Sequence, residues 1–132
     1  MNPFYVHAAF MGVGVILICV GIYVAHFLRK KSWWLKIHHS TGITGVACLA
    51  CGLIAAVVMV SQGEGRHLRI PHTWLGMVSI AFAMTTPALG HLQFKIRSHS
   101  QQLRGWHRRI GYTALILCML AILSGVVVSV YM

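Results

Sequence analysis

Acidic residues are almost absent from this 132-residue sequence. It contains one Glu, Glu64, and no Asp, against eleven Lys and Arg, and only 9% of its residues are charged. Charged residues make up about a quarter of a typical soluble domain, so this composition excludes an ordinary soluble fold. A hydrophobic content of 58% excludes a disordered chain. The shortage of carboxylates excludes acid–base catalysis by a carboxylate pair and disfavours cation or proton transport through intramembrane carboxylates.

The charged residues gather in three short windows. These hold Arg29, Lys30, Lys31 and Lys36, then Glu64, Arg66 and Arg69, and then Lys95, Arg97, Arg104, Arg108 and Arg109. The four stretches outside the windows are uncharged, and each exceeds the roughly 20 residues that a helix needs to cross a bilayer. They are 1–28, 37–63, 70–94 and 110–132. Because backbone groups in lipid must form hydrogen bonds within their own segment, each stretch is predicted to be a helix.

The predicted fold is an all-α membrane four-helix bundle with both termini outside. One domain is expected over 1–132, with helices at about 4–28, 34–61, 70–93 and 106–131. Cytoplasmic loops carry an excess of Lys and Arg, so loops 29–36 and 95–109 are expected in the cytoplasm. This describes an integral, multi-pass protein of a plasma or inner membrane, surrounded by lipid. Because the bases are confined to short loops, no nucleic-acid partner is expected.

Nine histidines are the second unusual feature of the sequence. A polar group inside a membrane is costly without a partner and is a candidate functional group. His7 and His72 lie near the outer ends of two predicted helices, and His38 and His107 lie near the inner ends of the other two. Facing imidazoles in a helical bundle are a known way to hold haem iron. We therefore expect two non-covalent b-type haems, ligated by His7–His72 and by His38–His107.

Small and basic residues lie where such haems would need them. Gly42, Gly76 and Gly111 each follow a proposed ligand by four positions, one helical turn later on the same face, and leave room for a porphyrin. Haem propionates need cations. The candidates are Arg66 and Arg69 near the outer pair, and Lys36, Arg104, Arg108 and Arg109 near the inner pair.

Other histidines offer a rival set of ligands. His26 follows His7 by nineteen positions, and His91 follows His72 by nineteen, a repeat that indicates two related hairpins, 1–66 and 67–132. Nineteen residues turn a helix by about 100° relative to its start, so two such histidines would not share a face. His39 adjoins His38 and also points about 100° away from it, so only one of the two faces the bundle core.

The four ligand motifs, in this order, resemble the transmembrane domain of the cytochrome b-561 and ferric reductase family over nearly the whole chain. The motifs are His7-Ala8-Ala9-Phe10-Met11, Trp34-Leu35-Lys36-Ile37-His38 with Gly45 seven residues after the histidine, His72-Thr73-Trp74-Leu75-Gly76, and Trp106-His107-Arg108-Arg109-Ile110-Gly111. The second motif favours His38 over His39. The resemblance implies four core helices, two bis-histidine haems b, and electron transfer across the membrane.

Members of that family pass electrons between ascorbate or quinol and an acceptor. With four core helices rather than the six of ascorbate-linked members, this chain is expected to work with a separate redox partner protein or subunit. A quinone and a second copy of the chain are further candidate partners. Two other functions stay open at this point: a haem-free membrane anchor of a redox complex, and a small transporter of cations or hydrophobic drugs.

Overall fold

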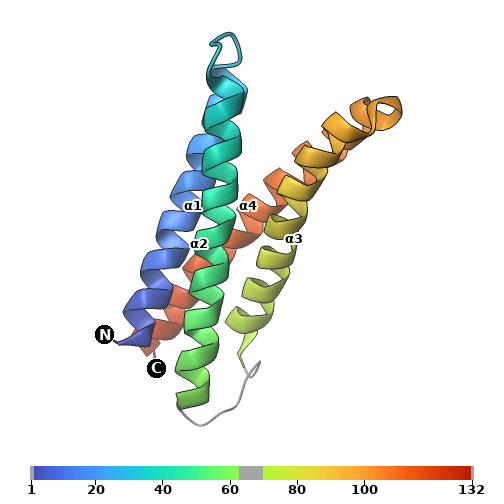
Figure 1. The fold of residues 1–132 in the computed structure, drawn as a ribbon. Coiled ribbons are helices and arrows are strands. Elements are labelled where there is room, and N and C mark those ends of the chain that lie inside the picture. Colours follow the sequence, from blue (N-terminus) through green and yellow to red (C-terminus); the bar gives the residue numbers. More distant parts are fainter. Residues whose placement is uncertain (1, 63–69, 132) are drawn as a thin grey trace. The chain divides into compact units, whose positions relative to one another are not determined.

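The computed structural model describes residues 2–62 and 70–131, which are almost entirely helical (Figure 1). Its elements are α1 (Pro3–Phe27), α2 (Trp34–Gln62), α3 (Pro71–Lys95), the short 3₁₀ helix η1 (Arg97–His99) and α4 (Ser100–Tyr131). Each of the four α-helices is long and apolar enough to cross a membrane. The predicted all-α class with four membrane-length helices is therefore confirmed within the described ranges.

Local chemistry explains where the first and third helices begin. The Asn2 side chain accepts a hydrogen bond from the backbone N–H of Phe4 at 3.0 Å and caps α1. Pro3 and Pro71 occupy the first positions of α1 and α3, where the missing N–H of proline removes no helical hydrogen bond. Pro87 lies inside α3 and removes one hydrogen bond from that helix.

The start of α4 differs from the expected position near residue 106. The helix begins at Ser100, because Gln101, Gln102, Leu103 and Arg104 are good helix formers and nothing in water prevents them from extending it. Arg104, Arg108 and Arg109 therefore lie on exposed faces of α4 and not in a loop. At 1.5 Å per residue, this helix is longer than the roughly 30 Å hydrocarbon core of a bilayer.

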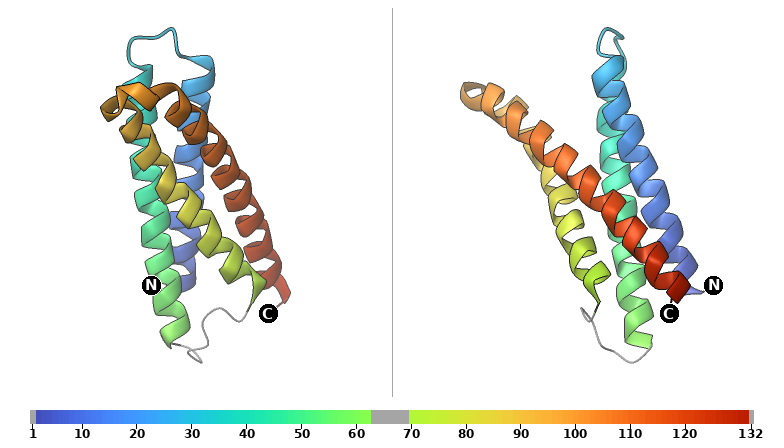
Figure 2. Two further views of the ribbon diagram at one scale, coloured as in Figure 1. Left: turned by 90° about the vertical axis from the view of Figure 1, so that its right-hand side faces the viewer. Right: turned by 180° about the vertical axis from the view of Figure 1, so that it is seen from behind.

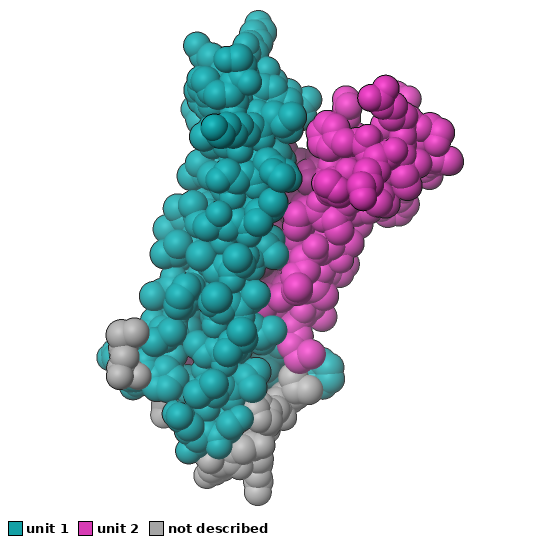
Figure 3. Space-filling view, in the orientation of Figure 1, with its two compact units in different colours: residues 1–74 teal, residues 75–132 magenta. Residues whose placement is uncertain are grey.

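The chain divides into two compact units, residues 1–74 and 75–132 (Figure 3). In the first, α1 and α2 lie side by side and antiparallel through the turn at 28–33 (Figures 1 and 2). In the second, α3 and α4 are joined through η1. The division falls inside α3, eight residues after the boundary at 66 that the histidine spacing indicates, so His72 belongs to the first unit.

The buried positions of the two hairpins repeat along with the histidines. Gly14 and Val15 are buried in α1. The positions that follow them in α3 by the same interval that separates His7 from His72 are Ser79 and Ile80, and both are buried as well. Helix α2 buries Gly45, Leu49 and Gly52. The equivalent positions of α4, counted by the interval from His38 to His107, are also buried; they are Ala114, Cys118 and Ala121. Each hairpin thus buries the same helix faces.

Helices α1 and α2 approach most closely at two glycines. A Cβ atom placed on Gly14 would lie 2.9 Å from the backbone oxygen of Gly45, and one placed on Gly45 would lie 2.9 Å from the oxygen of Gly14. Leu49, 1% exposed, packs against the same point. In lipid, such close packing is a main source of helix association, because apolar side chains gain nothing by leaving the hydrocarbon.

Substituting Gly14 by Ala should therefore destabilise the first hairpin. The new methyl meets backbone, which cannot rotate away, so the overpacking cost of about 1–3 kcal/mol should exceed the helix-propensity gain of about 1 kcal/mol. Gly12→Ala is the matched control, since a Cβ atom there meets nothing within 4 Å. Unfolding in mixed micelles measures both variants. Equal stability of the two would contradict the close approach.

Candidate functional site

Exposure separates four of the nine histidines from the others. His7, His38, His72 and His107 are half-buried, and these are the four predicted haem ligands. The rival candidates His26, His39 and His91 are exposed, as is the loop residue His99. His67 lies outside the described residues. The structure therefore encloses the matched-depth set more than the rival set.

His7 is tied to the neighbouring helix by its ring. From the second turn of α1, its Nδ1–H donates a hydrogen bond of 2.9 Å to the backbone oxygen of Gly52 in α2. Gly52 is buried, and a Cβ atom there would lie 3.2 Å from the methyl and Cγ carbons of Met11. The small residue lets Met11 and α1 come close enough for the imidazole to reach the carbonyl.

His38 makes the same type of contact in the opposite direction. Its Nδ1–H donates at 2.9 Å to the backbone oxygen of Gly21, a buried residue of α1. A Cβ atom on Gly21 would lie 2.8 Å from the hydroxyl oxygen of Thr41. That hydroxyl donates to the backbone oxygen of Ile37 at 2.8 Å, which fixes Thr41 against its own helix. Gly21 is thus required for α2 to bring His38 within reach.

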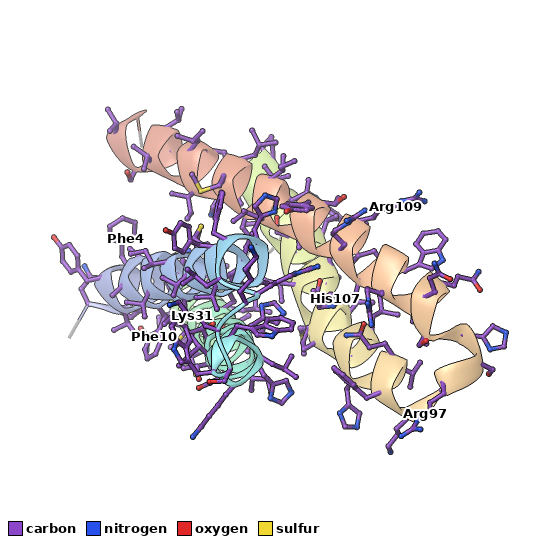
Figure 4. All side chains as sticks on the ribbon, turned by 90° about the horizontal axis from the view of Figure 1, so that it is seen from above. Phe4, Phe10, Lys31, Arg97, His107 and Arg109 are labelled. Carbon is purple, nitrogen blue, oxygen red and sulfur yellow. The ribbon has the colours of Figure 1, made fainter. Side chains whose placement is uncertain are left out.

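His107 repeats the contact in the second hairpin. It points from α4 toward α3, where its Nδ1–H donates at 2.8 Å to the backbone oxygen of Thr86 (Figure 4). Thr86 follows Gly21 by the interval that separates His72 from His7, so the accepting carbonyls are equivalent in the two hairpins. Gly90 makes space for the ring, since a Cβ atom there would lie 3.1 Å from Cε1 and 3.2 Å from Nδ1 of His107.

These three contacts fix which ring nitrogen carries the proton. A backbone carbonyl only accepts hydrogen bonds, so Nδ1 of each imidazole must be the protonated nitrogen. In the neutral ring, the lone pair then belongs to Nε2. Metal-ligating histidines have this arrangement, with one nitrogen donating to a carbonyl or carboxylate and the other free to bind the metal. His7, His38 and His107 share the Nδ1 contact of this arrangement.

The outer pair meets within the first compact unit. The ring centroids of His7 and His72 lie 6.3 Å apart, and the ring planes are inclined by 84°. The two rings thus form an edge-to-face contact.

The inner pair is divided between the two units. His38 belongs to residues 1–74 and His107 to residues 75–132, and each is described within its own hairpin. The pairing of His38 with His107 stays a prediction. Each of the two nevertheless has the hydrogen bond that a ligand at this depth needs.

The three expected porphyrin-facing glycines divide into two kinds. A Cβ atom on Gly42 or Gly76 would meet nothing within 4 Å, so both positions leave open space one turn from His38 and His72. At Gly111 the added atom would lie 3.3 Å from the side-chain methyl of Thr86. The missing side chain of Gly111 thus lets α4 pack on α3.

The expected propionate partners are only partly placed. Arg66 and Arg69 lie outside the described residues. Lys36, Arg104, Arg108 and Arg109 are exposed on α2 and α4. Within the described ranges, no three or more His, Cys, Asp or Glu come together as a metal site. Haem iron, which takes two axial protein ligands, does not require such a cluster.

The accepting carbonyls and the glycines beside them have no signature in the sequence. Gly21, Gly52 and Gly90 resemble any other small residue of a membrane helix, and a backbone oxygen has no side-chain signature. The available signal was the repeat, because Gly21 and Thr86 occupy equivalent positions in α1 and α3. A scan of protein-family models and searches of curated proteins and of solved structures found no match to this chain. Function is therefore inferred from the side chains described above.

The tautomer assignment can be tested directly. In nitrogen-15 spectra of histidine-labelled protein without haem, at about pH 8.5 where a free imidazole is neutral, His7, His38 and His107 should show protonated Nδ1 and bare Nε2. The exposed His26 and His39 serve as internal references. Protonated Nε2 at the three sites would contradict the carbonyl contacts.

Gly90→Ala should disturb His107 specifically. Its Cβ atom would crowd the imidazole, so the contact with the Thr86 oxygen should weaken and the His107 signals should shift toward a mixture of tautomers. Gly105→Ala on α4 is the control, because a Cβ atom there meets nothing within 4 Å. The same spectra should show His7 and His38 unchanged in both variants. Unaltered His107 signals in Gly90→Ala would show that Gly90 is not needed to make space for the imidazole.

Proposed function

We propose that this chain is a membrane electron-transfer protein that binds two b-type haems between pairs of histidines. The observation that carries the proposal is the repeated contact of Nδ1 with a carbonyl of the partner helix, at 2.9 Å for His7 and His38 and 2.8 Å for His107. In a neutral ring each contact puts the lone pair on Nε2, and each imidazole is half-buried in a helix of membrane-spanning length.

The residues divide into two proposed sites. His7 and His72, whose rings are in edge-to-face contact, would hold the haem near the outer face. His38 and His107 would hold the haem near the inner face. Haem, when bound, supplies an iron that changes its charge by one electron. Because two histidines occupy both axial positions, the protein would hold a redox centre with no open position for oxygen or a substrate.

A purely structural role explains the same contacts less completely. Polar side chains do tie membrane helices together, and one histidine–carbonyl bond needs no further explanation. Three such bonds, each donated by Nδ1 to a backbone carbonyl of the neighbouring helix, are more than two short-looped hairpins need. The contact of His7 with His72 adds a fourth imidazole to the set. Transport is less well supported, since the sequence has no carboxylate in any of the four helices.

The resemblance to the cytochrome b-561 and ferric reductase transmembrane domain agrees with this proposal. That family also pairs histidines from four helices around two haems. The electron donor and acceptor are proposed to include a redox partner protein, and quinol is a second candidate. Under the positive-inside rule, the basic windows 29–36 and 95–109 support an exchange at the cytoplasmic side.

Single substitutions should remove haem one site at a time. His72→Ala should abolish the outer haem and His107→Ala the inner haem, because a single axial histidine holds haem weakly, so each variant should retain about half of the wild-type haem. A pyridine haemochrome assay per mole of purified protein measures this.

The exposed histidines provide matched controls. His26→Ala and His91→Ala remove the same side chain from α1 and α3 and should keep the full haem content. Loss of haem from these two variants, with retention in His72→Ala and His107→Ala, would establish the rival ligand set. Unchanged haem in all four variants would reject histidine ligation.

A further inference from the structure

An aromatic and cationic stack leads from the protein surface to His38. The ring of Trp34 lies 6.3 Å from the ring of His38, with the planes inclined by 33°. The guanidinium carbon of Arg29 lies over the same Trp34 ring, 5.8 Å from its centroid and within the range of a cation–π interaction. Arg29 is held in turn, since its Nε–H donates to the backbone oxygen of Ala25 at 2.6 Å.

The stack runs from an exposed residue to a half-buried one. Arg29 is exposed at the end of α1, Trp34 is half-buried as the first residue of α2, and His38 is half-buried one turn later. Together with the Gly21 contact, it fixes the His38 ring both at Nδ1 and through a neighbouring aromatic ring. Trp34 is therefore an aromatic side chain in contact with both His38 and the exposed Arg29.

The position equivalent to Trp34 in the second hairpin is not aromatic. The residue one turn before His107 is Leu103, which has no aromatic ring. Trp106 adjoins His107 in sequence, but it is 49% exposed and points about 100° around the helix from it. The two hairpins repeat in their buried faces and histidines, so the difference at Trp34 is a specific feature of the first.

The turn that carries the stack has charge of one sign. Arg29, Lys30, Lys31 and Lys36 are all exposed there, and the sequence contains no acidic residue before Glu64. Figure 4 looks onto this end of the hairpin and labels Lys31. Trp33, 45% exposed, lies among these bases. The surface combines positive charge with exposed aromatic area, and such a surface attracts and orients a partner of opposite charge.

The position of two lysines in the turn favours a soluble partner. Lys30 and Lys31 are exposed and lie midway along the chain between the end of α1 at Phe27 and the start of α2 at Trp34. An acidic protein in solution can therefore reach both side chains.

We propose that the turn 29–36 docks an acidic, soluble one-electron carrier protein, and that Trp34 is the side chain through which the electron passes between the carrier and the site at His38. This inference rests on the proposed function. One electron leaves the reduced centre of the carrier, which is oxidised, and reaches the site at His38, which is reduced. No bond is made or broken and no proton moves. Trp34 bridges the two centres without being oxidised itself.

Charge reversal tests the docking surface. The Lys30→Glu, Lys31→Glu double variant should lower the second-order rate of reduction by a chemically reduced, acidic [2Fe–2S] ferredoxin by about tenfold at low salt, and weaken the dependence of that rate on ionic strength. The matched control is Lys95→Glu, Arg97→Glu in the second hairpin, which should stay within about twofold of wild type. An equal or larger effect in the control would overturn the proposal.

Binding of the oxidised ferredoxin to the protein in nanodiscs gives a second readout that does not depend on turnover. Binding should be salt-sensitive, should be lost in the Lys30→Glu, Lys31→Glu variant, and should persist when the discs contain anionic lipid. If anionic lipid abolishes binding, the turn is a headgroup site and the proposal fails. If wild-type protein binds no haem, the proposed function fails at once. Normal haem content with unchanged binding in the double variant would reject this inference alone.

Trp34→Leu tests the bridging role, since it copies the residue found at Leu103. At saturating ferredoxin, its rate of reduction should fall by about tenfold while haem content, spectrum and midpoint potential stay at wild-type values. Trp106→Leu is the control and should leave the rate unchanged. Should Trp34→Leu lose haem, the rate is measured in Trp34→Phe, which keeps a ring beside His38 and should be about threefold slower. A wild-type rate in the haem-bearing Trp34 variant would overturn the role of Trp34.

Discussion

The hydrogen bond from imidazole Nδ1 to a backbone carbonyl on the adjacent helix is the interaction on which the rest of this structure depends. It satisfies a polar group that would otherwise be costly in a membrane, and it sets the tautomer and the direction of the ring. His7 and His38 form this bond in opposite directions across α1 and α2, and His107 forms it between α4 and α3. The helices must therefore be close at these points, and the glycines beside the contacts allow it.

That requirement links packing to function. Gly14 and Gly45 bring the backbones of α1 and α2 together, and Gly21, Gly52 and Gly90 stand beside the contacts that involve the imidazoles. Each of these positions has a neighbour that a methyl group would crowd. Gly42 and Gly76, by contrast, leave open space one turn from a histidine. Glycine thus serves two needs in this protein: the approach of one helix to another, and room beside a candidate ligand. Both hairpins bury equivalent helix faces and use glycine for the approach of one helix to another.

Much of the fold could be predicted because the bilayer restricts the choices. Four uncharged runs of membrane length must each form a helix, because backbone groups in lipid form hydrogen bonds within their own segment. The described residues contain these four helices. The predicted start of α4 near residue 106 is wrong, because the prediction treats Arg104 and its neighbours as loop residues. These residues form a helix equally well in water, and α4 begins at Ser100. The sequence predicts four histidines at matched depths as ligands, and the same four are half-buried in the structure, whereas the other described histidines are exposed. The carbonyl partners of His38 and His107 could not be predicted, since their position depends on how one helix is rotated against another. The sequence predicts that Gly111 leaves room for a porphyrin, whereas in the structure it lets α4 pack against α3. Both roles require a residue without a side chain, so the sequence alone does not separate them.

The most direct test of this account is the haem content of the purified, detergent-solubilised chain. A pyridine haemochrome assay with oxidised and reduced spectra counts the haems and reports their spin state. Two low-spin b haems per chain are predicted, one for each pair of histidines. One haem would mean that only one pair is correct. Protein that binds no haem, even when haem is supplied during expression, would contradict the electron-transfer function and leave the histidine–carbonyl bonds as structural ties between helices.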